Sequence, residues 1–319
     1  MEQGKKKVSV IMCAYNETAE ELKQAIQSIL QQTFRDFELL IVLDNPENQE
    51  IWKILSAYAL QDPRIRLIKN EKNLGVAEST NRAWKQAEGE YIAKMDADDI
   101  ADPRRLEIEI ETLEKEGLDF VAASKQNIDE NGKSLGLFVN ELNTEQLKKL
   151  LPYDNLITQS TVLMKKNVLK ELGGYLPLPS CEDYDLWIRM MCSGYKMAVL
   201  PVVLVDYRVR KTSITRTNYY RQYRMEQIVK TLYRRWKKTG ELWSRQEMEA
   251  CLEAKQADPK KRDRFNAAYQ NYYQGMEARK LGQYGRAVKL VTKAVSADPR
   301  VLDIFIKKLM FHLRKRFAV

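Results

Sequence analysis

Three carboxylates, Asp96, Asp98 and Asp99, fall within four residues and directly follow a short apolar run that begins at Tyr91. Such a run is typical of a strand buried on both faces, and in open α/β sheets ligands bind just beyond the carboxyl ends of the strands. Carboxylates crowded at such a place repel one another unless a positive charge lies among them. Because hard divalent cations take oxygen ligands and often bridge to a substrate phosphate, Asp96 and Asp98 predict a metal site that holds a diphosphate.

The acids that follow Asp98 have another interpretation, which is that they begin a helix. Asp102 precedes Pro103, and an Asp at the N-cap before a Pro at the first helical position is a common helix start. We therefore interpret Asp102 as a capping residue. Asp99 fits capping and metal binding equally well, whereas Asp96 and Asp98 lie upstream of the cap.

A second acidic group, Glu182 and Asp183, precedes the apolar face of a helix that we expect to end at Gly194. Acids in a first helical turn interact favourably with the helix dipole, so capping by itself could explain one of them. With two consecutive acids, one carboxylate is left to point into a cleft. An attacking hydroxyl must lose its proton to such a group, and we expect a general base here.

Alternating strands and helices must position these acids. The apolar runs predict strands at 8–15, 37–43, 64–69 and 90–95, with helices at 18–32, 49–60 and 76–87, the first of which opens with a capping box from Thr18 to Glu21. A hairpin of two further strands is predicted at 119–124 and 135–139. This alternation is typical of a parallel, doubly wound α/β sheet. Glu17, Asp44, Asp96 and Asp98 all follow strand ends, so we expect them at one edge of that sheet. No GxGxxG follows any of these strands, which argues against a dinucleotide-binding dehydrogenase.

The charge of the chain is distributed unevenly. Its 319 residues carry a net charge of +9. Residues 1–206 hold 25 Lys and Arg against 34 Asp and Glu, a net charge of −9, and residues 207–319 hold 28 against 10, a net charge of +18. An acidic part joined to a strongly basic one predicts an anionic surface as the partner of the basic part.

Composition also indicates the compartment. The four cysteines form no CxxC pair, which favours a reducing environment and argues against a structural zinc site. The polar, basic N-terminus precedes no apolar stretch of signal-peptide length, and no segment reaches the ~18 apolar residues of a membrane span. We therefore expect a cytoplasmic protein that does not cross a membrane.

Taken in order, the motifs of this chain resemble glycosyltransferase family 2, the inverting GT-A-fold enzymes that use nucleotide-diphospho-sugars. The resemblance covers residues 8–215. The matching motifs are Val8-Ser-Val-Ile-Met-Cys-Ala-Tyr-Asn-Glu17, Asp44, Asn73-Leu-Gly-Val-Ala-Glu-Ser-Thr-Asn81, Asp96-Ala-Asp98-Asp99 with Pro103-Arg-Arg-Leu106, Gly173-Gly174-Tyr175, Glu182-Asp183-Tyr-Asp-Leu-Trp, and Tyr207-Arg208-Val-Arg210-Lys-Thr-Ser213. Each motif is weak by itself, whereas the ordered set is specific. It implies a GT-A domain over residues 1–215.

The resemblance implies which residues hold the nucleoside of the donor. They are Ala14, Tyr15, Glu17, Asp44 and Asn81. The family often carries a second acid or small residues after the acid of the second strand, whereas this chain has Asn45-Pro46. That departure leaves the identity of the base open, and UDP is the nucleotide that we favour.

The resemblance also implies roles for the two acidic groups. Asp96 would lie near the ribose and the metal, and Asp98 would bind Mg²⁺ or Mn²⁺. Asp183 matches the general base, with Glu182 beside it to orient the acceptor or the base. Where the family often has a histidine, this chain has Arg210. Its guanidinium could hold the diphosphate as a bidentate donor, or it could be a solvated surface group.

These residue types fit the chemistry of sugar transfer. A divalent cation stabilises the negative charge of a departing nucleoside diphosphate, and a positioned carboxylate takes the proton of the acceptor hydroxyl. A single displacement inverts the anomeric centre, so an α-linked donor would give a β-linked product.

The basic part of the chain is predicted to be an all-α extension over residues 216–319. Expected helices cover 217–238, 244–257, 260–281, 284–297 and 299–317. The segment 272–299 resembles one tetratricopeptide unit. A single unit cannot bury its own face, so we expect a helical hairpin packed on its neighbours.

The last predicted helix interleaves apolar and basic residues from Val301 to Phe317. A basic amphipathic helix is typical of a segment that lies on an anionic membrane surface, although a core-packed helix with a solvated basic face has the same pattern. Nothing in the tail resembles a nucleic-acid recognition module, so we expect no nucleic-acid partner.

We therefore predict a metal-dependent inverting glycosyltransferase, peripheral on the inner face of the membrane. It would move a hexose or N-acetylhexosamine from a UDP-sugar to a hydroxyl of a glycan or lipid-linked acceptor in bacterial surface-polysaccharide synthesis. One alternative is a sugar nucleotidyltransferase, which usually has a Gly-rich basic loop where this chain has Ala14 to Glu17. Another is a non-enzymatic helical scaffold with a decayed transferase domain, against which the intact Asp96, Asp98 and Asp183 argue. The sequence does not indicate an oligomeric state.

Overall fold

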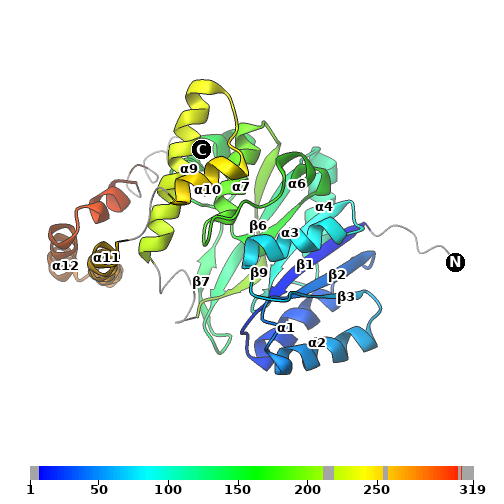
Figure 1. The fold of residues 1–319 in the computed structure, drawn as a ribbon. Coiled ribbons are helices and arrows are strands. Elements are labelled where there is room, and N and C mark those ends of the chain that lie inside the picture. The colour runs from blue at the N-terminus through cyan, green and yellow to red at the C-terminus, as the bar shows by residue number, and fades with distance from the viewer. Residues whose placement is uncertain (1–6, 211–218, 254–257, 308–309, 311–319) are drawn as a thin grey trace. The chain divides into compact units, whose positions relative to one another are not determined.

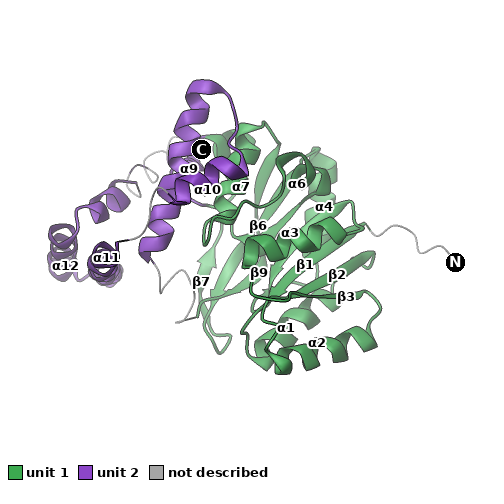
Figure 2. Cartoon of the chain, viewed as in Figure 1, with its two compact units in different colours: residues 1–148, 156–210 green, residues 149–155, 211–319 purple. Residues whose placement is uncertain are grey.

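The structure is a computed structural model that describes residues 7–210, 219–253, 258–307 and 310. The chain divides into two compact units, shown in Figure 2. One unit comprises residues 1–148 and 156–210, and the other comprises residues 149–155 and 211–319. The short segment 149–155 is thus grouped with residues that come much later in the chain. The expected boundary between residues 215 and 216 falls in 211–218, outside the described residues.

The first unit is built on one nine-stranded sheet (Figure 1). Its strands are β1 Val8–Ala14, β2 Phe37–Leu43, β3 Ile65–Lys69, β4 Tyr91–Asp96, β5 Ile100–Ala101, β6 Phe120–Ile128, β7 Ser134–Phe138, β8 Val162–Lys165 and β9 Met197–Arg208. Their order is β3-β2-β1-β4-β8-β6-β9-β5, and β7 pairs with β6. β1 is parallel to β2 and β4, β2 to β3, and β6 to β9. β8 is antiparallel to both of its neighbours. Most paired residues lie in parallel pairs, and the predicted α/β fold with a mostly parallel sheet is confirmed.

Helices connect these strands as the alternating pattern predicts. They are α1 Ala19–Leu30, α2 Gln49–Gln61, α3 Val76–Gln86, α4 Arg105–Glu116, α5 Thr144–Leu150, α6 Lys166–Leu172 and α7 Glu182–Cys192, with the 3-10 turn η1 Gln159–Thr161. Apolar residues of α1, α2 and α4 share one core with alternate residues of β1 and β2. Because successive side chains of a strand point to opposite faces, the remaining residues of these two strands lie on the other face, and α3 packs against both strands. All seven residues of β2 are consequently buried.

Three strands, β5, β8 and β9, were not predicted from the sequence. β9 pairs with β5 at its end, where Asp206 lies opposite Ile100, and with β6, where Arg208 lies opposite Ile128. This pairing brings the end of β9 next to the segment that carries Asp98. The partners are about a hundred residues apart in the chain, so local sequence patterns could not reveal the pairing.

The second unit is helical, as predicted for the C-terminal extension. Its helices are α9 Tyr219–Thr239, α10 Arg245–Glu253, α11 Pro259–Lys280 and α12 Tyr284–Ala297. Buried residues of α9, α11 and α12, among them Tyr220, Phe265 and Ala294, form its core. A Cβ at Gly275 of α11 would lie 2.9 Å from the side chain of Val291 on α12, so a glycine permits the close approach of this helical hairpin.

Residues 300–307 are helical as well. Most of the predicted last helix, from residue 308 onward, lies outside the described residues apart from residue 310. Over the part of the chain that the structure describes, no helix has the length and the apolar character needed to cross a membrane.

Candidate active site

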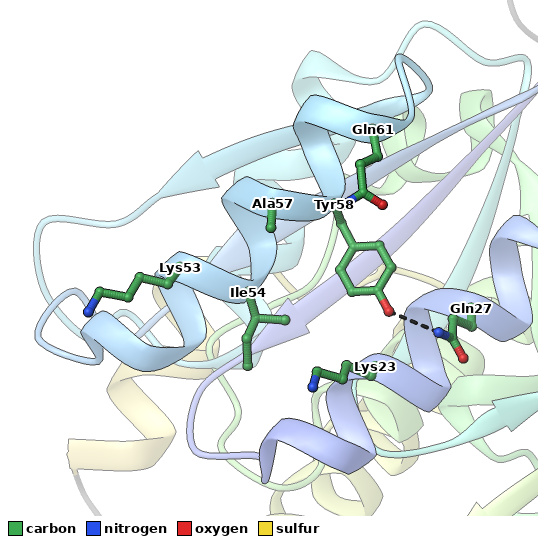
Figure 3. A pocket seen from close by; sticks show the side chains of 7 residues that line it. All are labelled: Lys23, Gln27, Lys53, Ile54, Ala57, Tyr58 and Gln61. Carbon is green, nitrogen blue, oxygen red and sulfur yellow. Dashed lines mark hydrogen bonds between the residues drawn. The ribbon is translucent and has the colours of Figure 1, made fainter.

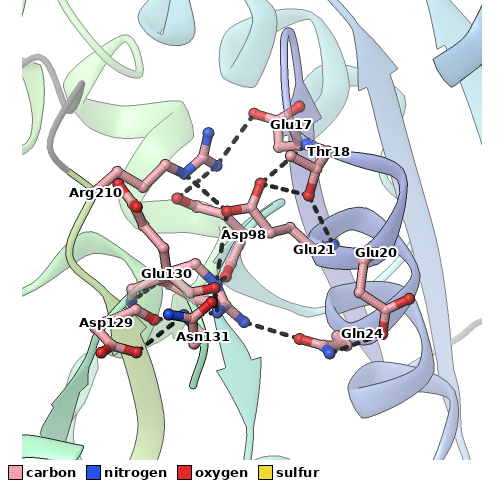
Figure 4. Close-up of polar contacts among 12 residues, drawn as sticks. Glu17, Thr18, Glu20, Glu21, Gln24, Asp98, Asp129, Glu130, Asn131 and Arg210 are labelled. Atoms are coloured by element: carbon pink, nitrogen blue, oxygen red, sulfur yellow. Dashed lines mark hydrogen bonds and ion pairs between the residues drawn. The ribbon is translucent and has the colours of Figure 1, made fainter. Parts of the chain in front are cut away.

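Asp98 lies in a cluster of carboxylates around the guanidinium of Arg210 (Figure 4). Nη2 of Arg210 is 2.6 Å from Oδ2 of Asp98 and 4.0 Å from Oε1 of Glu17, and its Nε is 3.5 Å from Oε1 of Glu21. Burial raises the pKa of Asp98 and of Glu17, and the positive charge of Arg210 offsets this effect only in part. The structure thus brings together Glu17, Asp98 and Arg210, and it adds Glu21, to which the sequence assigned no role in the site.

Two of these carboxylates are held by the turn that follows β1. Oε2 of Glu17 accepts a hydrogen bond from the backbone N–H of Tyr15 at 2.7 Å. Oε2 of Glu21 accepts from the N–H and from the hydroxyl of Thr18, both at 2.9 Å, which completes the capping box of α1. The other oxygen of each carboxylate, Oε1, is the one within ion-pair distance of Arg210. Local structure therefore aims two carboxylate oxygens at the place where Asp98 also points.

Asp96 ends β4 and has a different environment. Its Oδ1 accepts a hydrogen bond from Nζ of Lys94 at 2.9 Å, and its backbone N–H donates to the hydroxyl of Ser160 at 3.2 Å. Lys94 is 1% exposed. Burial disfavours the charged form of Asp96, but the ammonium of Lys94 outweighs burial and lowers the pKa of this carboxyl. Asp96 is therefore a charged acid with one oxygen already bound to a buried cation.

Arg208 of β9, to which the sequence assigned no role, holds the segment of Asp98 and Asp99 in place. The backbone N–H of Arg208 donates to Oδ1 of Asp99, and Nε donates to the carbonyl oxygen of Asp98, both at 2.8 Å. The guanidinium also donates to the carbonyl oxygens of residues 129–130 and to the side chain of Gln24. Asp99 is 1% exposed, and burial raises its pKa well above the ordinary value. Asp99 is thus a buried acid in the segment that Arg208 holds.

Ala14, Tyr15 and Asp44 lie at the ends of β1 and β2. Ala14 is fully buried, and its carbonyl oxygen accepts a hydrogen bond from the N–H of Asp44, whereas the side chain of Tyr15 is 42% exposed. The carboxylate of Asp44 accepts hydrogen bonds of 2.7 to 2.9 Å from the side chain of Asn70 and from the backbone N–H groups of residues 74–75. Both of its oxygens are therefore used to fix the loop that leads into α3.

Asn81 of α3 is engaged in the same way. Its Nδ2 donates to the carbonyl oxygen of Tyr175 at 2.7 Å, and its Oδ1 accepts from the N–H of Tyr175 and from Nε1 of Trp84, both at 2.9 Å. The neighbouring Gly174 has a φ of 76°, and a Cβ there would lie 2.4 Å from Oδ1 of Asn81. Asn81 thus joins α3 to the loop that precedes α7, at a point where only a glycine fits.

Glu182 and Asp183 form the first turn of α7. Ser180, two residues before Glu182, has a φ of 65°, a strained conformation for a residue other than glycine. Oδ1 of Asp183 accepts a hydrogen bond from the N–H of Tyr184 at 2.6 Å, and Oε2 of Glu182 accepts from the N–H of Cys181 at 3.0 Å. Burial and the neighbouring charge of Asp183 raise the pKa of Glu182 to about 7. Asp183 is the less buried of the two acids.

Two residues that the sequence did not single out lie between the acidic groups. Lys125 of β6 and Tyr207 of β9 are both close enough to Asp183 and to Asp96 for the charges of these acids to affect their pKa values, although burial is the larger cause in each case. The structure therefore places the acids after β4 and the acids of α7 at one site. No sequence motif marks Lys125, because its position depends on the pairing of β6 with β9.

Other features lie away from this site. A hollow of about 460 Å³ between α1 and α2 is lined by Lys23, Gln27, Lys53, Ile54, Ala57, Tyr58 and Gln61 (Figure 3). None of the candidate residues lines it. Within the ranges that the structure describes, no group of three or more His, Cys, Asp or Glu side chains is arranged to hold a metal ion by itself.

Comparisons with known proteins show which proteins this chain is similar to. The model of the family described as Glycosyl transferase family 2 matches residues 9–173. An uncharacterized glycosyltransferase of Methanocaldococcus jannaschii is 38% identical over 240 residues, which are 74% of this chain and 81% of that protein. The O-antigen biosynthesis glycosyltransferase WbnJ of Escherichia coli is 33% identical over 65% of this chain and 81% of its own length. The UDP-Glc:alpha-D-GlcNAc-diphosphoundecaprenol beta-1,3-glucosyltransferase WfaP of Escherichia coli is 30% identical over 70% of this chain and 86% of its own length.

A solved structure is similar in fold. The crystal structure of S. aureus TarS superposes with a TM-score of 0.56 at 20% sequence identity. The matched region covers 77% of this chain and 42% of TarS. At this level of identity the likeness concerns the fold.

Proposed function

The chain belongs to glycosyl transferase family 2 and is a glycosyltransferase, and we propose that it is a metal-dependent, inverting one. Its donor would be a UDP-hexose or UDP-N-acetylhexosamine, and its acceptor a hydroxyl of a glycan or of a lipid-linked sugar. The observation that supports this proposal most directly is that Asp98, at a strand end, and Asp183, at a helix start, both belong to one site. Each of these acids has the surroundings that one half of the reaction needs.

The first half of the reaction is departure of the nucleoside diphosphate. Asp98, with Asp96 beside it, would hold Mg²⁺ or Mn²⁺. The residues present fit such an ion, because magnesium is usually held by one or two carboxylates together with waters and substrate phosphates. When bound, the cation would offset the negative charge that develops on the leaving diphosphate. Lys94 keeps Asp96 ionised, as such a role requires.

Arg210 would bind the diphosphate oxygens directly. Its guanidinium is already at the carboxylate of Asp98, and a guanidinium matches the geometry of phosphate oxygens. Ala14, Tyr15 and Glu17 would contact the nucleoside. For Asp44 and Asn81, whose polar atoms are hydrogen-bonded inside the protein, we propose that they shape the nucleoside site through the loops they hold.

The second half of the reaction is attack by the acceptor hydroxyl. Asp183 would accept its proton, and Glu182 would orient the acceptor or Asp183. A single displacement at the anomeric carbon would invert its configuration. Removal of the proton by a positioned carboxylate typically raises the reaction rate by a factor of about 10² to 10⁴.

The acceptor and the location are proposed from relatives and from charge. The name of WfaP describes an acceptor sugar on diphosphoundecaprenol, and that of WbnJ describes O-antigen biosynthesis. We propose a lipid-linked acceptor of the same chemical kind in surface-polysaccharide synthesis, a cytoplasmic location, and two domains over residues 1–215 and 216–319. The net charge of +18 over residues 207–319 supports contact of the second domain with an anionic membrane surface. Lack of binding to anionic liposomes at low salt would exclude that contact.

A thermal-shift panel tests the donor and the metal together. Wild type and Asp98→Ala would be heated with UDP-, GDP-, TDP- and CMP-based nucleotides, each with and without Mn²⁺. A ligand that prefers the folded state raises the midpoint of unfolding. We expect a Mn²⁺-dependent shift with UDP that Asp98→Ala abolishes. A wild-type protein that responds to no nucleotide would contradict the proposed function.

A further inference from the structure

Lys125 brings to the site a positive charge that forms no ion pair with any residue that the structure describes. It lies on β6, opposite Phe138 of β7 and Val205 of β9. Its Nζ is 3.7 Å from the ring centroid of Tyr207 and 5.9 Å from that of Phe138. Over the described part of the chain, the ammonium group of Lys125 makes neither a hydrogen bond nor an ion pair. Two aromatic rings are thus the contacts that hold a half-buried ammonium group.

The surroundings of Lys125 show why this arrangement calls for an anion. Burial lowers the pKa of Lys125 to about 8, against the opposing effect of Asp99, Asp183 and Asp96, the charged groups that face it from β4, its following loop and α7. Their attraction is too weak to cancel the loss of hydration, because none of these carboxylates reaches the ammonium. A buried cation is stabilised when an oxygen anion contacts it directly. A further negative group in direct contact with the ammonium of Lys125 would therefore stabilise its charged form.

The position of Lys125 indicates whether such an anionic group belongs to the donor or to the acceptor. The charges that act on it are Asp183, the proposed base, together with Asp96 and Asp99. Asp98, Glu17 and Glu21 lie within ion-pair distance of Arg210. Lys125 is thus near the acid that the proposed function assigns to the acceptor, whereas Arg210 is the cation at the carboxylates proposed for the donor diphosphate.

We propose that Lys125 binds an anionic oxygen group of the acceptor, either the phosphate of a phospho-linked lipid carrier or the carboxylate of an acidic sugar. This inference rests on the proposed function, since it uses Asp183 to locate the acceptor. Tyr207 has a positioning role, because its ring holds the ammonium in place. The ammonium donates hydrogen bonds to the anionic oxygens, and no covalent step is involved.

The test measures binding of small probes to the full-length protein by calorimetry. Geranyl diphosphate represents the phosphate source and glucuronate the carboxylate source, with geraniol and glucose as their uncharged counterparts. The variants are Lys125→Met, Lys125→Arg and, as a control, Lys133→Met, which removes an exposed lysine from the turn after β6. Binding of UDP with Mn²⁺ is measured on each protein in parallel.

We expect wild type to bind one of the two anions more tightly than its uncharged counterpart, and the anion that binds identifies the source. Lys125→Met should weaken that binding by about ten-fold or more, the usual effect of losing a charged hydrogen bond, whereas Lys125→Arg and Lys133→Met should retain it. Wild-type affinity should fall between pH 7 and pH 9 as the ammonium loses its proton, and Lys125→Arg should show no such fall. The affinity for UDP in the presence of Mn²⁺ should be the same for wild type and for the three variants.

Two results would overturn the inference. One is that neither anion binds more tightly than its uncharged counterpart, and the other is that Lys125→Met binds the anion as well as wild type does. Failure of the proposed function has a separate signature, since wild type would then bind no UDP with Mn²⁺ whatever the anion data show.

Discussion

Nη2 of Arg210 and Oδ2 of Asp98 are 2.6 Å apart, so the carboxylate proposed to bind the metal is already paired with a cation of the protein. Glu17 and Glu21 lie around the same guanidinium (Figure 4). A divalent ion that comes to Asp98 without a nucleotide has to compete with Arg210. When the ion comes together with a diphosphate, the diphosphate oxygens can replace Asp98 as partners of the guanidinium.

Arg210→Ala should therefore change metal and nucleotide binding in opposite directions. Removing one positive charge beside three carboxylates should tighten binding of Mn²⁺ alone by about ten-fold. It should weaken binding of UDP in saturating Mn²⁺ by a similar factor, because a charged contact to the diphosphate is lost. Titrations of free Mn²⁺ by electron paramagnetic resonance and of UDP by calorimetry measure the two effects. Arg245→Ala, which removes an exposed arginine paired with Glu249, is the control. Weaker binding of Mn²⁺ alone to Arg210→Ala would contradict the proposed competition.

Two acids of α7 should respond differently to the same substitution. Asp183→Asn should lower sugar transfer about 10²-fold or more while leaving the unfolding midpoint and UDP binding unchanged, because only the proton acceptor is lost. Asp185 is fully buried and paired at 2.8 Å with Arg189, itself 2% exposed. Asp185→Asn leaves that guanidinium without its countercharge and should cost about 3 kcal/mol of stability. Denaturant unfolding and donor-turnover assays on both variants separate the two roles. Transfer at the wild-type rate by Asp183→Asn would rule out this residue as the base.

Neighbouring glycines before α7 provide a test of the packing around Asn81. Gly173 has a φ of 73° and no atom within 4 Å of an added Cβ, so Gly173→Ala should cost only the backbone strain, about 1 kcal/mol. Gly174 has a φ of 76°, but there the Cβ would lie 2.4 Å from Oδ1 of Asn81 and 2.9 Å from Nε1 of Trp84. Gly174→Ala should cost about 3 kcal/mol, because overpacking adds to the strain. Equal unfolding free energies for the two variants would show that the Asn81 contact can relax.

The raised pKa of Glu182 predicts a dependence of stability on pH. Burial and the charge of Asp183 raise this pKa from its ordinary value of 4.5 to about 7 in the folded protein. Between these two values the folded state binds more protons than the unfolded state, so this residue makes stability decrease as pH rises from 4.5 to 7. Glu182→Gln should remove that contribution. The free energy of unfolding of the variant minus that of wild type should therefore be larger at pH 7.5 than at pH 4. Denaturant unfolding at both pH values measures the difference. A constant difference between the two proteins would exclude a raised pKa.

The expected α/β fold was predictable because its strands and helices have strong local patterns. The apolar runs at 8–15 and 37–43 are continuous, since both faces of the central strands are buried, and the observed strands β1 and β2 lie within them. The capping box at Thr18 marked the start of α1. β5, β8 and β9 carry no comparable signal. Each forms because of partners elsewhere in the sheet, and a two-residue strand such as β5 has no periodicity of its own.

The sequence by itself determined that acids follow strand ends, that a second acidic pair begins a helix, and that the charge of the tail is strongly positive. These properties depend on residue types and on short-range order. The tertiary structure decided that Arg210 pairs with Asp98, that Arg208 holds the backbone of Asp98, and that Lys125 reaches the site. It also decided that the polar atoms of Asp44 and Asn81 are used inside the protein. The reason is physical. A side chain's partners depend on strand pairing and loop closure between residues far apart in the chain, and neighbouring residues in the sequence do not encode them.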